Sequence, residues 1–524
     1  MSNVADNADP AKASCSAVSG TLVWNIIIGV SLVISFAVLV LYLQQPITDV
    51  HGFRQTQTAL TSFWLPEQWQ IFRYQTPVLG APWSIPFEFP LFQIFASVLW
   101  LAGVPLDAAG RIVSWLAMAG TLYPMYKICG RLFGDNRCFT YCAPLYLLSP
   151  IMLFWGRTFM IETFAVFLLA MFLWYCMLAI DTGHFAAYLA AALFATLGMV
   201  VKLTTAPPFL VAAGLYALLR LRQRGILRSW RCVLGLGLVM GLALGMTWWW
   251  VGFSDHVKLQ NTFGQHLSSG SLTSWNFGTL AQRLDPVNWG ALLRRLNSSI
   301  LGGDIWLYVL AAVSVFAARH YRFIAFAAVL LFLLPILVFF NLHRVHNYYQ
   351  TANAVFILMA GGITYAGLDR SGHGVWARSL LILQLASMVF VFNTGEYAAP
   401  LRHPYMRPVN VGHFVREHTP EKTAIVVFGC DWSSEIPYYA QRKSIVASDW
   451  MLGKSPQMAN TLDRHLGDLP LAAVVTCPRT EKEDPRHPVA AEAITHISNP
   501  KAAVIDGCTV TYQDGEAGGQ TDAQ

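Results

Sequence analysis

A dense cluster of polar side chains follows the first long apolar run of the chain. The run extends from Thr21 to Leu43, and Asp49, His51, Arg54 and Gln55 come directly after it. A carboxylate, an imidazole and a guanidinium together can bind an anion and transfer a proton. At the centre of a bilayer each charge would cost roughly 2.5–3.5 kcal/mol, so the cluster must meet water or a polar ligand. A solvated loop at a helix end is the simpler interpretation, but charged residues recur at matching positions farther along, and we favour a site.

The composition of the chain is that of a membrane protein. Of its 524 residues, 55% are hydrophobic and 12% are charged, whereas soluble domains usually carry about 25% charged residues. Apolar runs long enough to span a bilayer recur along most of the length. We therefore expect a polytopic α-helical membrane protein. The polar start, residues 1–20, lacks the basic segment of a cleavable signal peptide, so the first run should remain as an anchor.

Eleven membrane-spanning helices are expected. Their approximate ranges are 21–43, 109–127, 138–155, 162–180, 185–203, 205–220, 232–252, 301–318, 323–340, 351–368 and 379–394. The apolar segment from Pro90 to Pro105 is short for a span, and we interpret it as an interfacial or re-entrant helix. All basic clusters between spans then lie on one side, which the positive-inside rule makes cytoplasmic. The N-terminus is cytoplasmic in this topology, and we expect a bacterial inner-membrane protein. The sequence has no basic patch with interleaved aromatic residues, so nothing in it indicates binding to nucleic acid.

The unusual polar residues all fall on the extracytoplasmic side of this topology. The first outer loop, residues 44–106, carries the polar cluster and Glu88. The remaining outer segments carry Arg157, Glu162, Lys202, His256, Lys258, His343, Arg344, His346, Tyr348 and Tyr349. The other side holds only simple basic anchors. The charge rule and the distribution of polar residues therefore indicate the same orientation.

The composition becomes that of a soluble protein from about residue 395. Residues 423–429, 471–476 and 502–505 are expected to be short buried strands, which predicts a small extracytoplasmic α/β domain over residues 395–513. Residues 1–20 and the acidic, glycine-rich tail 514–524 are expected to be disordered. Several polar and aromatic side chains of the domain are candidates for a binding surface, although packing at strand ends is the favoured interpretation: Asp431, Trp432, Tyr438, Tyr439 and Arg442.

The nine cysteines show no CxxC pair and no Cys/His spacing typical of a metal site. Those in or beside apolar runs are interpreted as small packing residues: Cys129, Cys138, Cys142, Cys176 and Cys232. A disulfide between Cys477 and Cys508 remains open if their region is extracytoplasmic.

An ordered series of short motifs runs through residues 21–394. It consists of Asp49 with HGFRQ at 51–55, FEFPL at 87–91, AAGR at 108–111, RLFG at 131–134, Pro150, Arg157 with Glu162, Lys202, and HNYY at 346–349. Together these segments resemble the GT-C superfamily of membrane glycosyltransferases, especially the protein O-mannosyltransferase and aminoarabinose transferase families, which use polyprenyl-phosphate-linked sugars. The adjacent acids and the Lys-Pro-Pro segment of those families are replaced here, so the identity of the sugar and of the acceptor stays open.

The resemblance implies an inverting glycosyltransferase with a GT-C-like bundle of about eleven helices. Its donor would be a polyprenyl-phosphate-linked sugar, and its acceptor an extracytoplasmic glycan, lipid or protein. Asp49 is the expected general base, with a helix-capping aspartate as the alternative. Glu162 is the second expected catalytic acid, and a structural pair with Arg157 is equally open.

Two further groups of side chains complete the expected site. The candidates for binding the donor phosphate are Arg54, Lys202, Lys258, Arg344, His346, Tyr348 and Tyr349. The candidates for the sugar or acceptor are His51, Gln55, Glu88, Arg157 and His256. No metal is assigned, although a divalent ion bound by Glu88, His51 and either His256 or His346 remains open.

Two other functions are compatible with such a chain. A transporter or flippase of lipid-linked sugars would need ionisable residues through both halves of the membrane and an internal repeat, and the sequence shows neither. An oligosaccharide ligase or polymerase that uses lipid diphosphate donors would need arginine and histidine for the phosphates, but not Asp49 as a base. The Asp49→Asn substitution therefore separates the last alternative from the favoured one.

Overall fold

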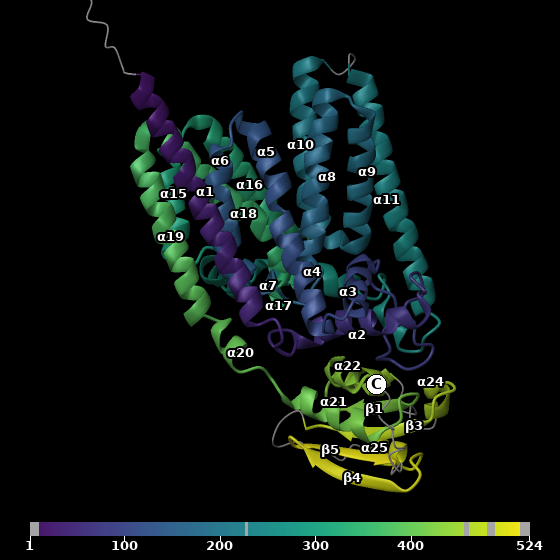
Figure 1. Cartoon of the computed structure of the whole chain (residues 1–524). Helices are drawn as coiled ribbons and strands as arrows, with labels where there is room; N and C mark the ends of the chain where they lie inside the picture. Colours follow the sequence, from purple (N-terminus) through teal and green to yellow (C-terminus); the bar gives the residue numbers. More distant parts are fainter. Residues whose placement is uncertain (1–9, 226–228, 455–460, 479–487, 514–524) are drawn as a thin grey trace, which may run out of the picture.

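The chain folds into a helical bundle with a small α/β domain packed against one end (Figure 1). The structure is a computed structural model, and it describes residues 10–225, 229–454, 461–478 and 488–513. The long bundle helices are α1 (Pro10–Leu41), α4 (Leu106–Gly120), α5 (Leu122–Phe133), α6 (Arg137–Leu148), α7 (Pro150–Trp155), α8 (Glu162–Thr182), α9 (Phe185–Val201), α10 (Ala206–Arg224), α11 (Trp230–Lys258), α15 (Ile305–Ser314), α16 (Arg319–Val338), α18 (Tyr349–Leu368) and α19 (Gly374–Thr394).

Shorter helices connect these elements. They are α2 (Gly52–Gln68), α3 (Leu91–Leu101), η1 (Leu203–Thr205), η3 (Gly264–Leu267), α12 (Thr273–Phe277), α13 (Leu280–Leu284), α14 (Pro286–Arg295), η4 (Leu296–Ile300), α17 (Phe340–Val345), η5 (Asp369–His373) and α20 (Ala398–Arg402). Helices α2 and α3 belong to the long loop between α1 and α4, and they lie at the end of the bundle nearest the α/β domain (Figure 1). This end is called the domain end below.

Six helical segments of the described chain are long and apolar enough to cross a membrane. They are Trp24–Leu41, Glu162–Thr182, Leu203–Arg224, Trp230–Lys258, Arg319–Val338 and Tyr349–Thr394. A seventh results if Pro286–Ile300 and Ile305–Ser314, which are bent by 84°, form one broken span. The last segment of the six contains both α18 and α19. The structure thus confirms a polytopic helical protein, while the number of eleven spans stays a prediction.

Two expected spans are broken helices. The helix expected at 138–155 divides into α6 and α7 at Ser149, because Pro150 begins a new helix and cannot continue the hydrogen bonding of the previous one. The helix expected at 109–127 divides into α4 and α5 at Thr121. Helix α1 begins at Pro10, so residues 10–20, which we expected to be disordered, are helical. Residues 1–9 and the expected disordered tail 514–524 lie outside the described residues.

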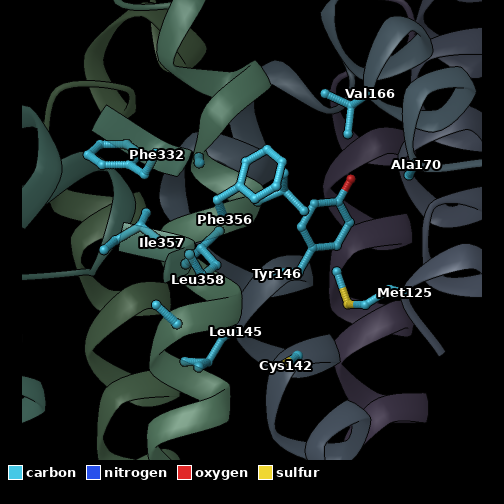
Figure 2. Close-up of a cluster of buried hydrophobic side chains, with 14 of the residues drawn as sticks. Met125, Cys142, Leu145, Tyr146, Val166, Ala170, Phe332, Phe356, Ile357 and Leu358 are labelled. Carbon is cyan, nitrogen blue, oxygen red and sulfur yellow. The ribbon is translucent and has the colours of Figure 1, made fainter. Parts of the chain in front are cut away.

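Helix α18 occupies the centre of the bundle. Almost every one of its residues is buried, which is typical of a helix that is apolar on all sides. Figure 2 shows Phe356, Ile357 and Leu358 of this helix packed with Tyr146 of α6 and Phe332 of α16. This apolar core holds α6, α8, α16 and α18 together, and it fixes the positions of the loops at their ends.

The C-terminal domain contains a five-stranded sheet. Its strands are β1 (Ala424–Phe428), β2 (Lys443–Ala447), β3 (Leu471–Thr476), β4 (Pro500–Ile505) and β5 (Cys508–Gln513), and their order is β2-β1-β3-β5-β4. Strands β1, β2 and β3 are parallel, and β5 is antiparallel to both β3 and β4. The helices are α21 (Arg407–His418), α22 (Glu435–Ala440), α23 (Asp449–Lys454), α24 (Leu462–Leu466) and α25 (Pro488–Ile494).

The small α/β domain that we expected is therefore present. The three expected strands correspond to β1, β3 and β4, whereas β2 and β5 were not expected. Cys477 and Cys508 form a disulfide that joins the end of β3 to the start of β5. The disulfide therefore links the parallel part of the sheet to its antiparallel part.

The α/β domain is attached to the long first loop of the bundle by hydrogen bonds. The edge strand β2 pairs with residues 77–80, because Ser444 N donates to Pro77 O at 3.0 Å and Val446 N donates to Val78 O at 2.8 Å. The hydroxyl groups of Tyr438 and Tyr439 both donate to the Asp107 carboxylate. Burial raises the pKa of Asp107, although these hydroxyl donors and Arg111 oppose the shift. The domain thus covers the part of the loop that carries the polar cluster.

Candidate active site

Asp49 lies in a fully enclosed ion pair. Its Oδ2 atom is 3.3 Å from Arg157 Nη2, and the exposed fractions of the two side chains are 0% and 1%. The other carboxylate oxygen accepts a hydrogen bond from Gln55 Nε2, and Gln55 Oε1 accepts from Phe159 N at 3.2 Å. Gln55 therefore fixes Asp49 and the chain beside Arg157 at the same time.

Arg157 does not pair with Glu162, which was the structural alternative that the sequence left open. Arg157 contacts Asp49, and Glu162 contacts Lys202, so the Arg157–Glu162 pair does not form. Arg157 precedes helix α8 in an irregular segment, whereas Glu162 is the first residue of that helix, and their side chains meet different partners. Burial lowers the pKa of Arg157 to about 10, despite the opposing effect of Asp49. The guanidinium remains charged at neutral pH.

A second ion pair joins Arg54 of helix α2 to Glu88. Arg54 donates to Glu88 Oε1 and to Gln57 Oε1, and the side chains of Arg54 and Glu88 are 13% and 22% exposed. Tyr74 supports this pair from the loop, because its hydroxyl donates to Glu88 O at 2.8 Å and accepts from Phe87 N at 2.6 Å. Arg54 and Glu88 are thus held in place and are still reachable by solvent.

Lys202 and Glu162 form a third ion pair, which is buried beneath two tyrosines. Lys202 Nζ donates to Glu162 Oε1, and the side chains are 5% and 1% exposed. The same ammonium lies 4.6 Å from the centre of the Tyr349 ring and 5.6 Å from that of Tyr348. A cation over aromatic rings gains electrostatic attraction from the ring faces. Glu162 Oε2 is buried and has no hydrogen-bond partner within the described residues.

Two histidines connect these ion pairs. The ring of His51 lies 5.2 Å from that of His346 and 5.1 Å from that of Tyr348. Burial lowers the pKa of His51, and Arg295 lowers it further, whereas a hydrogen bond from the imidazole to the Asn347 side chain and the nearby Glu396 oppose the shift. Burial also lowers the pKa of His346 to about 3, with additional lowering from the surrounding cations. Both imidazoles are therefore neutral at pH 7 and can donate or accept a hydrogen bond.

The backbone before helix α2 explains how His51 reaches this position. His51 adopts a left-handed conformation with φ of 53°, directly before the helix begins at Gly52. An added Cβ at Gly52 would lie 2.3 Å from Glu435 Oε1 of the α/β domain. A larger residue at this position would therefore displace the Glu435 side chain of helix α22.

The structure brings most of the expected residues together, but three remain apart. His256 is exposed on α11, and Arg344 is exposed and donates to Asn288 Oδ1 at 2.6 Å. Lys258 is paired with Asp255 at 3.1 Å, although it also lies 5.5 Å from the Phe87 ring, beside Glu88. We therefore place Lys258 at the edge of the cluster, and we do not include His256 or Arg344 in it.

Two charged residues that we did not expect also adjoin the site. Arg295 at the end of α14 donates to His343 O at 2.7 Å, and its charge lowers the pKa values of His51, His343 and His346. Glu396, which follows α19, accepts from Ser299 Oγ at 2.5 Å. An arginine at a helix end and a lone acid after a helix carry no specific sequence pattern, so only the packing of α14 and α19 identifies them.

The divalent metal site that the sequence left open does not assemble from its candidates. Within the described ranges, the one group of three or more potential metal ligands that converges is Cys129, Cys138 and Cys142. Glu88 is engaged by Arg54, and His256 is exposed on α11. The candidate active site consists instead of three ion pairs, two neutral imidazoles and two tyrosines.

Most of the polar and aromatic residues considered for a binding surface of the α/β domain pack inward, as the favoured interpretation predicted. Tyr438 and Tyr439 bind Asp107 of the bundle. Arg442 is buried and donates to Thr419 O at 2.6 Å. Trp432 differs from these residues, because its ring lies 6.4 Å from that of Phe87, beside Glu88. The packing interpretation therefore applies to the two tyrosines and Arg442, and Trp432 lies close to the site.

Two solved structures resemble the whole chain in fold. ArnT from Cupriavidus metallidurans bound to undecaprenyl phosphate matches with a TM-score of 0.63 and 14% identity, over 96% of this chain and 100% of that chain. ArnT in the apo state matches with a TM-score of 0.61 and the same identity and coverage. A comparison with curated proteins finds no match.

The chain resembles the GT-C membrane glycosyltransferases in its fold, and a family model also matches a part of its sequence. Within the chain, residues 89–250 match the family model for dolichyl-phosphate-mannose-protein mannosyltransferase. The matched segment contains Arg157, Glu162 and Lys202, and it ends at Trp250 within α11. The sequence resemblance to the GT-C superfamily is therefore confirmed.

Proposed function

We propose that the chain is an inverting glycosyltransferase that moves a sugar from a polyprenyl-phosphate donor to an extracytoplasmic glycan, lipid or protein. The observation that carries this proposal is the convergence of Arg54, Lys202, His51, His346 and Tyr348 at the domain end of the bundle. Cations and neutral hydrogen-bond donors together suit a phosphate whose negative charge grows as the sugar leaves. The undecaprenyl phosphate bound to ArnT supports a donor of this class.

The arrangement of charges suggests different roles for the ion pairs. Arg54 is partly exposed and can exchange its contact with Glu88 for a phosphate oxygen. Lys202 is held beneath Tyr348 and Tyr349, so we propose that it supplies fixed positive charge to the same phosphate. Glu162 positions Lys202, and its unpaired oxygen can accept a hydrogen bond from a sugar hydroxyl.

Asp49 is the proposed general base. Arg157 holds the Asp49 carboxylate in place at 3.3 Å, and a carboxylate can accept a proton from the attacking hydroxyl. Because the side chain is enclosed, the reaction requires the loop before helix α2 to open when the acceptor binds. Inversion follows from a single displacement at the anomeric carbon. The acceptor oxygen forms its bond as the bond to the phosphate oxygen breaks, and the proton passes to Asp49.

The proposed location is a bacterial inner membrane with the α/β domain on the extracytoplasmic side. Two observations support this orientation. The Cys477–Cys508 disulfide is typical of an oxidising compartment. The basic ends of α5 and α10, with Arg131, Arg222 and Arg224, lie away from the α/β domain and fit the cytoplasmic surface (Figure 1).

The proposal is tested by following release of sugar from a panel of radiolabelled polyprenyl-phosphate sugars. Purified protein in nanodiscs is combined with crude cell-envelope acceptor, and the product is separated from the lipid. Lys202→Met is compared with Lys127→Met, which makes the same change on α5 beside Tyr123 and Tyr126. We expect transfer by the unsubstituted protein and by Lys127→Met, and its loss in Lys202→Met. Transfer from lipid diphosphate donors alone would contradict the proposal.

A further inference from the structure

Three cysteine thiols converge inside the bundle, far from the candidate active site. Cys129 lies on α5, and Cys138 and Cys142 lie four residues apart on the facing side of α6. The three sulfur atoms are all within 4.8 Å of one another, and the three residues are fully buried. The turn between α5 and α6 lies at the end of the bundle away from the α/β domain (Figure 1).

We propose that these thiols form a binding site for a single monovalent copper ion. Three sulfur atoms bound to one ion with metal–sulfur bonds of about 2.3 Å, in a trigonal plane, would be about 4 Å apart. The observed separation of Cys138 Sγ and Cys142 Sγ is 3.7 Å. The third sulfur atom lies within the same limit, so only small rotations of the side chains are needed to bring all three onto one ion.

The number of ligands favours copper over zinc. Structural zinc sites almost always have four ligands, whereas this group supplies three sulfur atoms. Soft thiolate ligands suit monovalent copper, zinc and iron–sulfur clusters, so it is the number of three ligands that favours copper here. Cu⁺ replaces the proton of one thiol and forms a copper–thiolate bond, the released proton passes to water, and the other two sulfur atoms coordinate the ion as neutral thiols, so the site stays neutral. This charge balance matters because an uncompensated charge in an apolar interior is costly.

The packing around the cluster closes it on the side of helix α18. A Cβ added at Gly362 of α18 would lie 2.5 Å from Cys142 Sγ and 2.7 Å from Cys142 N. Cys142 Sγ also lies 3.6 Å from Met359 O. Figure 2 shows Cys142 at the edge of the buried core, beside Leu145. Helices α6 and α18 thus enclose the site in apolar surroundings, where bound Cu⁺ is shielded from oxidation by water-borne reagents.

The proposal is tested by titrating the full-length protein with Cu⁺ in detergent, without oxygen and with a reductant, in competition with a coloured Cu⁺ chelator. We expect one Cu⁺ per chain, and affinity lowered about tenfold or more in Cys129→Ala and in Cys138→Ala. The matched control is Cys176→Ala, which removes a buried thiol from α8, outside this group. Equal Cu⁺ affinity in the triple variant that also carries Cys142→Ala would overturn the proposal.

X-ray absorption of the copper-loaded, unsubstituted protein keeps the test independent of folding of the variants. We expect a first shell of three sulfur atoms at about 2.3 Å. A first shell of nitrogen or oxygen would overturn the site, and so would stoichiometric binding of Zn²⁺ by a protein that does not bind Cu⁺. Glycosyl transfer is measured separately, because the copper site does not rest on the proposed function.

Discussion

The enclosed pair of Asp49 and Arg157 makes the sharpest prediction for this protein. We expect Asp49→Asn to lower the free energy of unfolding by about 3–5 kcal/mol, which is the usual cost of breaking a buried ion pair from one side. The charges are 3.3 Å apart, and an effective dielectric constant of about 20 gives an attraction of about 5 kcal/mol. Arg157 Nε and Nη1 have no acceptor within the described residues, so no other group replaces the lost carboxylate.

The double variant Asp49→Asn, Arg157→Met separates stability from catalysis. Methionine keeps an apolar contact with the rings of Tyr42 and Phe154, each now 5.1 Å from the Arg157 guanidinium. Replacing a whole buried ion pair by uncharged groups is often neutral for stability. We therefore expect the double variant to unfold within about 1 kcal/mol of the original protein and to remain inactive, because the proposed base is absent.

Both quantities are measured on the same preparations. Unfolding is followed by tryptophan fluorescence during titration with SDS in mixed micelles, and transfer is followed with the radiolabelled donor. A single variant as stable as the original protein would refute the ion-pair reasoning. A double variant that regains full turnover would show that Asp49 is structural, and the role of base would then have to belong to another carboxylate.

Three further predictions follow from the other side chains. Lys202→Met should lower turnover about 100-fold or more, and it should also destabilise the protein because Glu162 loses its partner. Adding Glu162→Gln should restore stability but not activity. Melting and transfer assays on both variants check these expectations. Burial lowers the pKa of His343 to about 3, below its ordinary value of 6.5. The folded protein should therefore lose stability as pH falls below 6.5, by at most about 1.4 kcal/mol per pH unit, and melting of His343→Leu should depend less on pH. Replacing Cys477 and Cys508 by alanine should destabilise the α/β domain by about 4 kcal/mol, because the disulfide closes a loop with a sequence separation of 31. Limited proteolysis of that domain should then be faster. An unchanged rate of cleavage would contradict this prediction.

The sequence predicted the site better as a set of residues than as a set of contacts. Asp49, Arg54, Glu162 and Lys202 were all expected, because charges beside apolar runs are costly and therefore conspicuous. Their pairing was not predictable, since Arg157 is five residues from Glu162 in the chain and 108 residues from Asp49, its partner in the structure. Ion pairs across a helical bundle depend on how the helices pack, which a single sequence does not reveal.

The α/β domain shows the same division. Its strands β1 and β3 are continuous apolar runs, so the sequence predicted them, as expected for strands buried on both faces of a parallel sheet. Strand β2 includes Lys443 and Ser444, and only two residues separate it from α22. This mixed composition and short connection concealed it. Its identity as a strand depends on its pairing with β1 and with residues 77–80 of the loop.

The sequence by itself determined that the protein resides in a membrane, that its unusual charges gather in the loops at one side, and that an α/β domain follows. These properties depend on the free energy of transferring side chains from water to lipid, which is additive along the chain. Only the tertiary structure decided which carboxylate faces which cation, that the α/β domain packs against Gly52 and Phe53, and that three thiols of α5 and α6 converge. Those outcomes depend on helix packing at ångström precision, where Gly52 and Gly362 permit close approaches that no local pattern specifies.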